Sequence, residues 1–139
     1  RKGIYGNTMT ANPRALDVGT AVLNAVTPAM RKNIADRGVE FVGKFEALAK
    51  ELGGLITKVQ GTGLLFSAEL NDNYKCYGEN STEEYLRTKG IGVIHGGKNS
   101  LRYTPHFNIT AEEVDMIVEA TRDALLNGPQ AEQAKRASA

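Results

Sequence analysis

Arg102 is the residue whose type and setting point most directly to chemistry. It stands in Leu101-Arg102-Tyr103-Thr104-Pro105, at the end of a short β pattern and just before a turn. A guanidinium donates two parallel hydrogen bonds to the two oxygens of a carboxylate, so an arginine fixed on a strand end is suited to bind one. The alternative for an isolated arginine is a solvated residue at a strand edge, because long charged side chains are mostly exposed.

Two further segments contain residues that suit phosphate binding or tight turns. Gly6-Asn7-Thr8-Met9-Thr10-Ala11-Asn12-Pro13 opens a helix, and Val59-Gln60-Gly61-Thr62-Gly63-Leu64-Leu65 lies between two expected strands. Thr8 offers a small hydroxyl donor beside Gly6, whose missing side chain allows close approach of a ligand. The Gly-x-Gly lacks the third glycine and the following helix of a dinucleotide fingerprint, so we expect a tight turn or a bulge there.

In this order and at these distances, the three segments resemble the C-terminal part of class III aminotransferases, which are pyridoxal-phosphate enzymes of fold type I. The first resembles the family's Gly-x-Thr-x-x-x-Asn-Pro stretch, the second its Arg-Gly-x-Gly-Leu-Leu stretch, and the third its Leu-Arg-x-x-Pro-Pro-Leu stretch. The resemblance runs from about Tyr5 to about Leu126. It implies transfer of an amino group between an amino acid or amine and a 2-oxo acid, with pyridoxal 5'-phosphate as cofactor, in a homodimeric full-length enzyme.

The same resemblance implies roles for particular residues. Thr8 would contact the cofactor phosphate bound by the neighbouring subunit, and Asn7 would line the same pocket. Arg102 would bind the α-carboxylate of the substrate. Gly61 and Gly63 are interpreted as structural.

The chain departs from the family pattern at several of these positions. Thr10 and Ala11 stand where many members have glycines, and Gln60 stands where members often carry arginine before Gly-x-Gly. The family's Pro-Pro-Leu is Pro105-His106-Phe107 here. We expect the replacement of the second proline by His106 to widen or re-polarise the entrance to the site, and so to affect substrate choice. The identity of the amino donor stays open.

The resemblance places the Schiff-base lysine and the acidic partner of the pyridine nitrogen upstream of Thr8, before Arg1. Lysines are spread along this chain, and none lies in an apolar setting that would lower its pKa. We therefore expect no catalytic residue here, and a C-terminal domain that is inactive in transamination by itself. The alternative is a stand-alone α+β module in which Arg102 binds a small carboxylate without chemistry.

Composition bounds these interpretations. The chain has 139 residues, 41% of them hydrophobic, and a net charge of +1 from 17 basic and 16 acidic residues. This fits one globular domain, and it gives no electrostatic reason to expect nucleic-acid binding. No apolar run is long enough for a membrane span. The single cysteine, Cys76, forms no internal disulfide and favours a reducing, cytoplasmic location. His95 and His106 have no metal-site spacing, so we expect no metal.

The elements that must position Arg102 follow from caps and periodicity. The expected order is helix, long helix, strand, strand, helix, strand, strand, helix. The pattern predicts helices over 13–26, 28–52, 82–89 and 111–126, and strands over 55–60, 64–70, 91–94 and 101–104. This order predicts an α+β fold, with a small mainly antiparallel sheet, helices packed on one face, and a long helix before it. Residues 1–129 form the domain, and 130–139 are expected to be a disordered tail.

Two apolar patterns predict the core. The long helix carries one apolar face over about six turns, and Gly38 on that face would allow a neighbour to approach closely. In the second strand, Leu64, Phe66, Ala68 and Leu70 alternate with more polar residues, which predicts one buried face.

Overall fold

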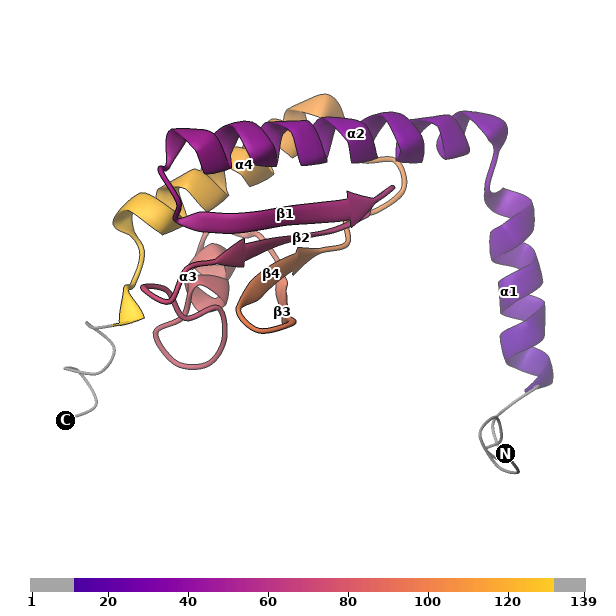
Figure 1. The fold of residues 1–139 in the computed structure, drawn as a ribbon. Helices are drawn as coiled ribbons and strands as arrows, with labels where there is room; N and C mark the ends of the chain where they lie inside the picture. The colour runs from indigo at the N-terminus through magenta and orange to yellow at the C-terminus, as the bar shows by residue number, and fades with distance from the viewer. Residues whose placement is uncertain (1–11, 132–139) are drawn as a thin grey trace, which may run out of the picture.

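The computed structural model describes residues 12–131. Within them the chain forms four helices and a four-stranded sheet (Figure 1). The helices are α1 (Pro13–Ala25), α2 (Pro28–Glu51), α3 (Thr82–Thr88) and α4 (Ala111–Asn127). The strands are β1 (Ile56–Thr62), β2 (Leu65–Leu70), β3 (Ile94–Gly96) and β4 (Ser100–Tyr103). The predicted α+β class is confirmed. Of the disordered tail expected over 130–139, residues 132–139 lie outside the described residues, and the N–H of Ala131 donates to the carbonyl of Asn73 at 2.8 Å.

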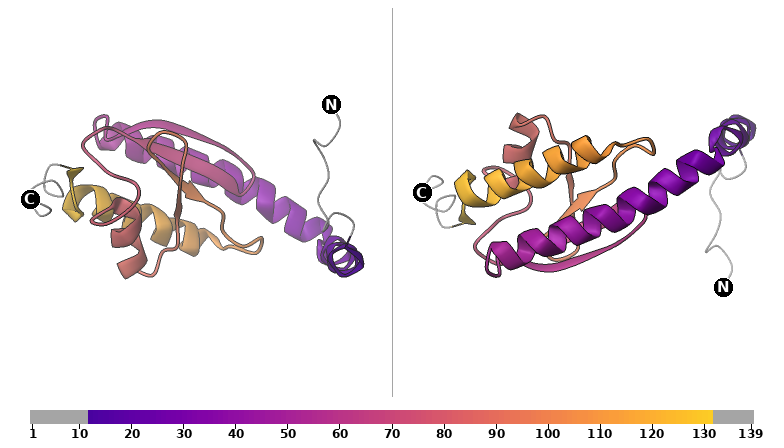
Figure 2. Two further views of the ribbon diagram at one scale, coloured as in Figure 1. Left: turned by 90° about the horizontal axis from the view of Figure 1, so that it is seen from below. Right: turned by 90° about the horizontal axis from the view of Figure 1, so that it is seen from above.

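The sheet is antiparallel, with strand order β1-β2-β4-β3. Helices α2 and α4 lie side by side over one face of it, and α3 packs against α4 (Figure 2). None of the described helices covers the opposite face, which is called the open face below. The prediction of helices on one side of the sheet is therefore confirmed.

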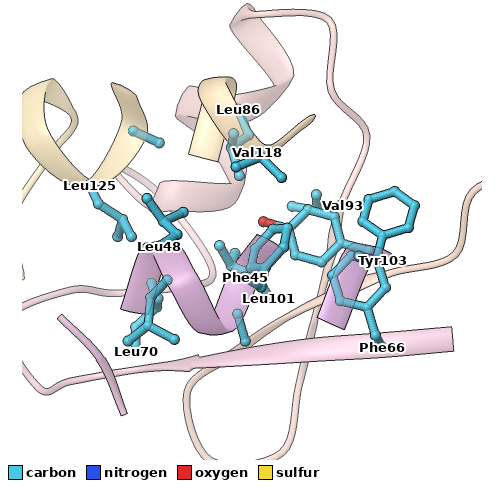
Figure 3. Packing of buried hydrophobic residues seen from close by; sticks show 14 of the residues in the cluster. Phe45, Leu48, Phe66, Leu70, Leu86, Val93, Leu101, Tyr103, Val118 and Leu125 are labelled. Carbon is cyan, nitrogen blue, oxygen red and sulfur yellow. The ribbon is translucent and has the colours of Figure 1, made fainter. Parts of the chain in front are cut away.

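The core lies between α2, α4 and the inner face of the sheet. Phe66 of β2 and Tyr103 of β4 stack with ring centroids 4.8 Å apart and planes 5° apart, and Phe45 of α2 meets Phe66 edge-on at 5.1 Å (Figure 3). Such aromatic pairs add to the free energy gained from burying their area. The predicted alternation in the second strand is confirmed, because Leu64, Phe66, Ala68 and Leu70 are all buried.

Helix α2 and the β1–β2 turn touch through two glycines. A Cβ added at Gly38 would lie 2.4 Å from the carbonyl oxygen of Gly63. Gly63 itself has a φ of +54°, the left-handed value that the first position of a tight hairpin turn favours. The close approach predicted at Gly38 is therefore confirmed, and its neighbour is the hairpin that carries Gln60.

Helix α1 stands apart from this body. It begins at a capping asparagine, Asn12, whose side chain accepts from the N–H of Arg14 at 3.0 Å. Its apolar stripe has the expected helical spacing, yet none of its residues is buried by the rest of 12–131. Leu23, for example, is 68% exposed. Among residues 12–131, no helix is both long enough and apolar enough to cross a membrane.

Two strands, β1 and β3, differ from their predicted bounds by more than one residue. β1 continues through Gly61 to Thr62, because Thr62 pairs with Leu65 across a two-residue turn. The predicted strand over 91–94 is wrong by about three residues, since β3 covers Ile94–Gly96. The N–H of Ile91 donates instead to the carbonyl of Leu86 at 3.0 Å and closes the end of α3.

Candidate functional site

Arg102 is held on β4 by the two residues that flank it. Leu101 and Tyr103 point into the core and are buried, while Arg102 alternates to the open face and is exposed. The hydroxyl of Tyr103 lies 2.9 Å from that of Thr121 in α4, and burial raises the pKa of this phenol far above its usual value. The backbone under Arg102 is thereby tied to both the sheet and the helical layer.

The strand register places Arg102 in a row with residues of three other strands. Gln60 of β1 pairs with Ser67 of β2, Ser67 pairs with Arg102, and Arg102 pairs with Ile94 of β3. Directly paired residues of antiparallel strands project to the same face, with Cβ atoms about 5 Å apart. Arg102 therefore has a serine hydroxyl as its immediate neighbour and a glutamine amide one strand further on.

A shallow depression of 470 Å³ lies over this part of the open face. Its lining residues are Gln60, Gly61, Thr62, Leu65, Phe66, Ser67 and Arg102. Gly96 of β3 leaves room beside the arginine, since a Cβ there would lie 3.8 Å from Cβ and Nε of Arg102. The depression thus combines polar side chains with one long cation at its edge.

Within residues 12–131, the side chains of Gln60, Ser67 and Arg102 form no hydrogen bond and no ion pair with another residue. Arg102 is the only charged residue among those that line the depression. The nearest charged pair on the same face, Lys58 and Glu69, lies one row away in register. A guanidinium whose donors are uncommitted can donate two parallel hydrogen bonds to a carboxylate.

The described lysines are not arranged for covalent chemistry. None of those between residues 12 and 131 is buried. Hydrogen bonds that Lys44 donates to Asp115 and Glu40 raise its pKa, and a bond that Lys89 donates to Asp123 raises the pKa of Lys89. A nucleophilic lysine needs the opposite shift, a lowered pKa.

Cys76 is equally unsuited to nucleophilic chemistry. Burial, reinforced by the charge of Glu83, raises the pKa of its thiol to about 12. At neutral pH the side chain is therefore a thiol and packs as a small apolar group.

Neither histidine lines the depression at Arg102. His106 faces the start of α4, with Nε2 3.5 Å from Oε2 of Glu113, and lines a separate hollow of 210 Å³. The ring of His95 lies against that of Tyr77, with centroids 4.0 Å apart and planes tilted by 37°. In residues 12–131 no group of histidine, cysteine, aspartate and glutamate side chains is placed to hold a metal ion.

The turn that follows β4 is fixed from α2. The side-chain amide of Asn33 donates to the carbonyls of Phe107 and Ile109, at 2.9 and 3.0 Å. This tether holds the Pro105–Phe107 segment against α2 and α4. His106 accordingly does not line the depression at Arg102.

The structure brings together only part of the predicted site. Asn7 and Thr8 lie outside the described residues, so their predicted contact with a phosphate stays a prediction. Arg102 lies on the open face, and Gln60 lines the same depression. Ser67 was missed, although its outward position followed from the alternation along the second strand. Its pairing with Arg102 had no local signal in the sequence.

Comparisons with known proteins agree with this fold. A family model described as Aminotransferase class-III matches residues 1–125. An acetylornithine aminotransferase from Elizabethkingia anophelis is 27% identical, with a TM-score of 0.70 over 91% of this chain and 33% of its own.

Two more distant structures share the fold. An (S)-enantioselective omega-transaminase from Thermomicrobium roseum is 21% identical, with a TM-score of 0.69 over 91% of this chain and 30% of its own. A lysine aminotransferase from M. tuberculosis is 18% identical, with a TM-score of 0.65 over 75% of this chain and 23% of its own. The chain therefore spans a third or less of the length of these three solved relatives.

Proposed function

Because the chain belongs to the class III aminotransferases, we propose that residues 1–129 act as the small C-terminal domain of an aminotransferase, in which Arg102 binds the substrate carboxylate. The reaction would move an amino group between an amino acid or amine and a 2-oxo acid. In this proposal the domain recognises the substrate, and a larger part of the protein performs the chemistry.

The proposal rests on one observation, the combination of a fixed backbone and a free side chain at Arg102 within residues 12–131. Its backbone is fixed by the buried side chains of Leu101 and Tyr103, while its guanidinium is exposed and unpaired within residues 12–131. A carboxylate at the depression would receive two parallel charge-assisted hydrogen bonds, which set its orientation as well as its affinity. Holding one end of the substrate in this way positions its reactive carbon relative to the rest of the enzyme.

The cofactor of this family is pyridoxal phosphate, which acts as an electron sink when bound. The described residues do not fit the covalent part of its site, since their lysines are unburied and, where shifted, have raised pKa values. We propose that Thr8 and Asn7 contact the cofactor phosphate across a homodimer, and that the chain by itself does not transaminate.

The substitution Arg102→Lys in the full-length protein tests the proposal. Lysine keeps the charge but loses the two-pronged geometry. We expect kcat/KM for donors with an α-carboxylate to fall by the equivalent of about 2–4 kcal/mol, the range for losing a well-placed charged contact. A plain amine, which lacks that carboxylate, should be much less affected in its half-reaction.

Arg87→Lys is the matched control. Arg87 lies on α3 in the helical layer, where it pairs with Glu83, and a lysine can keep that pair. The control should turn over both donors like the wild type. Equal losses for both donors in Arg102→Lys, or a collapse of its thermal stability, would show that Arg102 is a structural residue.

A further inference from the structure

From the geometry of the open face we propose that Ser67 and Gln60 extend the Arg102 site across β2 and β1, and make it selective for a monocarboxylate with a neutral polar group. The inference rests on the proposed function of Arg102 and adds the substrate class. Its basis is the cross-strand row Gln60–Ser67–Arg102, all three of which line the same depression.

Ser67 is the direct cross-strand neighbour of Arg102 in the proposed site. It is half-buried and directly opposite Arg102, so the Cβ atoms of the two residues lie about 5 Å apart across the strand pair. Its hydroxyl forms no hydrogen bond with any other residue of 12–131. It can donate to a lone pair of the carboxylate oxygen that the guanidinium leaves free.

Gln60 is the next residue in this cross-strand row, since it pairs with Ser67. It lies two strands from Arg102, about 10 Å across the sheet, and is exposed on β1. Its amide offers a neutral donor and a neutral acceptor. A ligand whose carboxylate rests on Arg102 would therefore present the rest of its chain to Gln60, beside Thr62 and Leu65.

The charge of this surface argues against a second carboxylate. Arg102 is the only cation among the lining residues, and Lys58 lies outside the depression, in register with Glu69. A second carboxylate at Gln60 would lose part of its hydration without gaining an opposite charge. A neutral amide or hydroxyl there would instead be matched by the glutamine side chain.

The direct test is binding measured by isothermal titration calorimetry on the cofactor-loaded full-length protein. Two probes of the same length are used, glutarate and its monoamide glutaramate. We expect glutaramate to bind about fivefold more tightly, which is the scale of one exposed charge interaction. Gln60→Arg adds the missing cation and should reverse that preference. Thr88→Arg, which adds the same charge on exposed α3, should leave it unchanged.

Ser67→Ala tests the nearer residue. It should weaken both probes about tenfold, because each loses one hydrogen bond to its charged group. Ser100→Ala is the matched control, since Ser100 lies one row away on the same face and does not line the depression. It should bind both probes like the wild type.

The outcomes separate this inference from the function of Arg102. If Arg102→Lys weakens both probes while the Ser67 and Gln60 variants bind like the wild type, the extended site is wrong and the carboxylate site stands. Tighter binding of glutarate by the wild type also overturns the inference. If Arg102→Lys itself changes neither probe, both proposals fail.

Discussion

Replacing Gly38 with alanine should destabilise the protein, although alanine is the better helix former. Gly38 lies within α2, where glycine costs about 1 kcal/mol relative to alanine. The new Cβ would meet the backbone of the β1–β2 turn, at 2.4 Å from the oxygen and 2.7 Å from the carbonyl carbon of Gly63. Neither atom can rotate away as a flexible side chain would.

The clash outweighs the gain in helix propensity. The turn or the helix has to shift by about 1 Å to restore a normal contact near 3.5 Å. Overpacking of this kind costs about 1–3 kcal/mol, and more where backbone rather than side chain must move. Because both atoms that the new Cβ meets are backbone atoms, we expect a cost of about 2–3 kcal/mol, in the upper part of that range. After the helix-propensity gain of about 1 kcal/mol, Gly38→Ala should lower the free energy of unfolding by about 1–2 kcal/mol.

Gly43 provides the control within the same helix. It is exposed, and a Cβ there would meet nothing within 4 Å. Gly43→Ala should therefore stabilise the protein by about 0.5–1 kcal/mol, from helix propensity alone. Urea unfolding of the two variants, followed by far-ultraviolet circular dichroism, measures both changes. If Gly38→Ala stabilises the fold as Gly43→Ala does, the hairpin does not rest on α2 and the reasoning is wrong.

Cys76 should resist a thiol reagent at pH 8 in the folded protein and react fully in urea, since burial raises its pKa to about 12; fast native labelling would contradict this. Bonds from Asn127, Lys89 and Tyr85 lower the pKa of Asp123 to about 2, so its stabilising contribution should be lost only as acid takes the pH from about 4 towards 2; carboxyl NMR titration measures this. Asn99→Ala should lower the free energy of unfolding by about 2–3 kcal/mol. The side-chain amide of Asn99 donates hydrogen bonds to the carbonyls of Tyr74 and Asn71 and accepts one from the N–H of Cys76. Calorimetric unfolding of the variant measures this loss.

The parts of the fold that sequence could predict are those set by local signals. The proline and cap pairs at Asn12-Pro13 and Thr27-Pro28 mark the starts of α1 and α2, and both side chains accept the expected backbone bonds. The alternation along β2 gave its buried face. β3 was misplaced because Ile91 and Val93 are apolar for a tertiary reason. Val93 belongs to the buried core and Ile91 packs against it, and neither residue lies in a strand pair.

Which residues surround Arg102 could not be predicted from nearby sequence, because they are brought together by pairing between strands that are distant along the chain. Strand β2 pairs with β4, and α3 and β3 lie between them along the chain. The register that puts Ser67 opposite Arg102 is set by this long-range pairing, which no turn between the two strands specifies. Sequence could therefore identify Arg102 as a candidate, but not its neighbours.

The inner face of the sheet contributes to stability, and we propose that the open face contributes to substrate recognition. Phe66, Leu101 and Tyr103 point inward and hold β2 and β4 against α2 and α4. The residues that alternate with them, Ser67 and Arg102, carry almost none of that packing. Because adjacent positions on a strand face opposite sides, the recognition surface can change one residue at a time without opening a cavity in the core. A domain built this way can keep its fold while its substrate preference varies, and position 60 is where the row offers that freedom most directly.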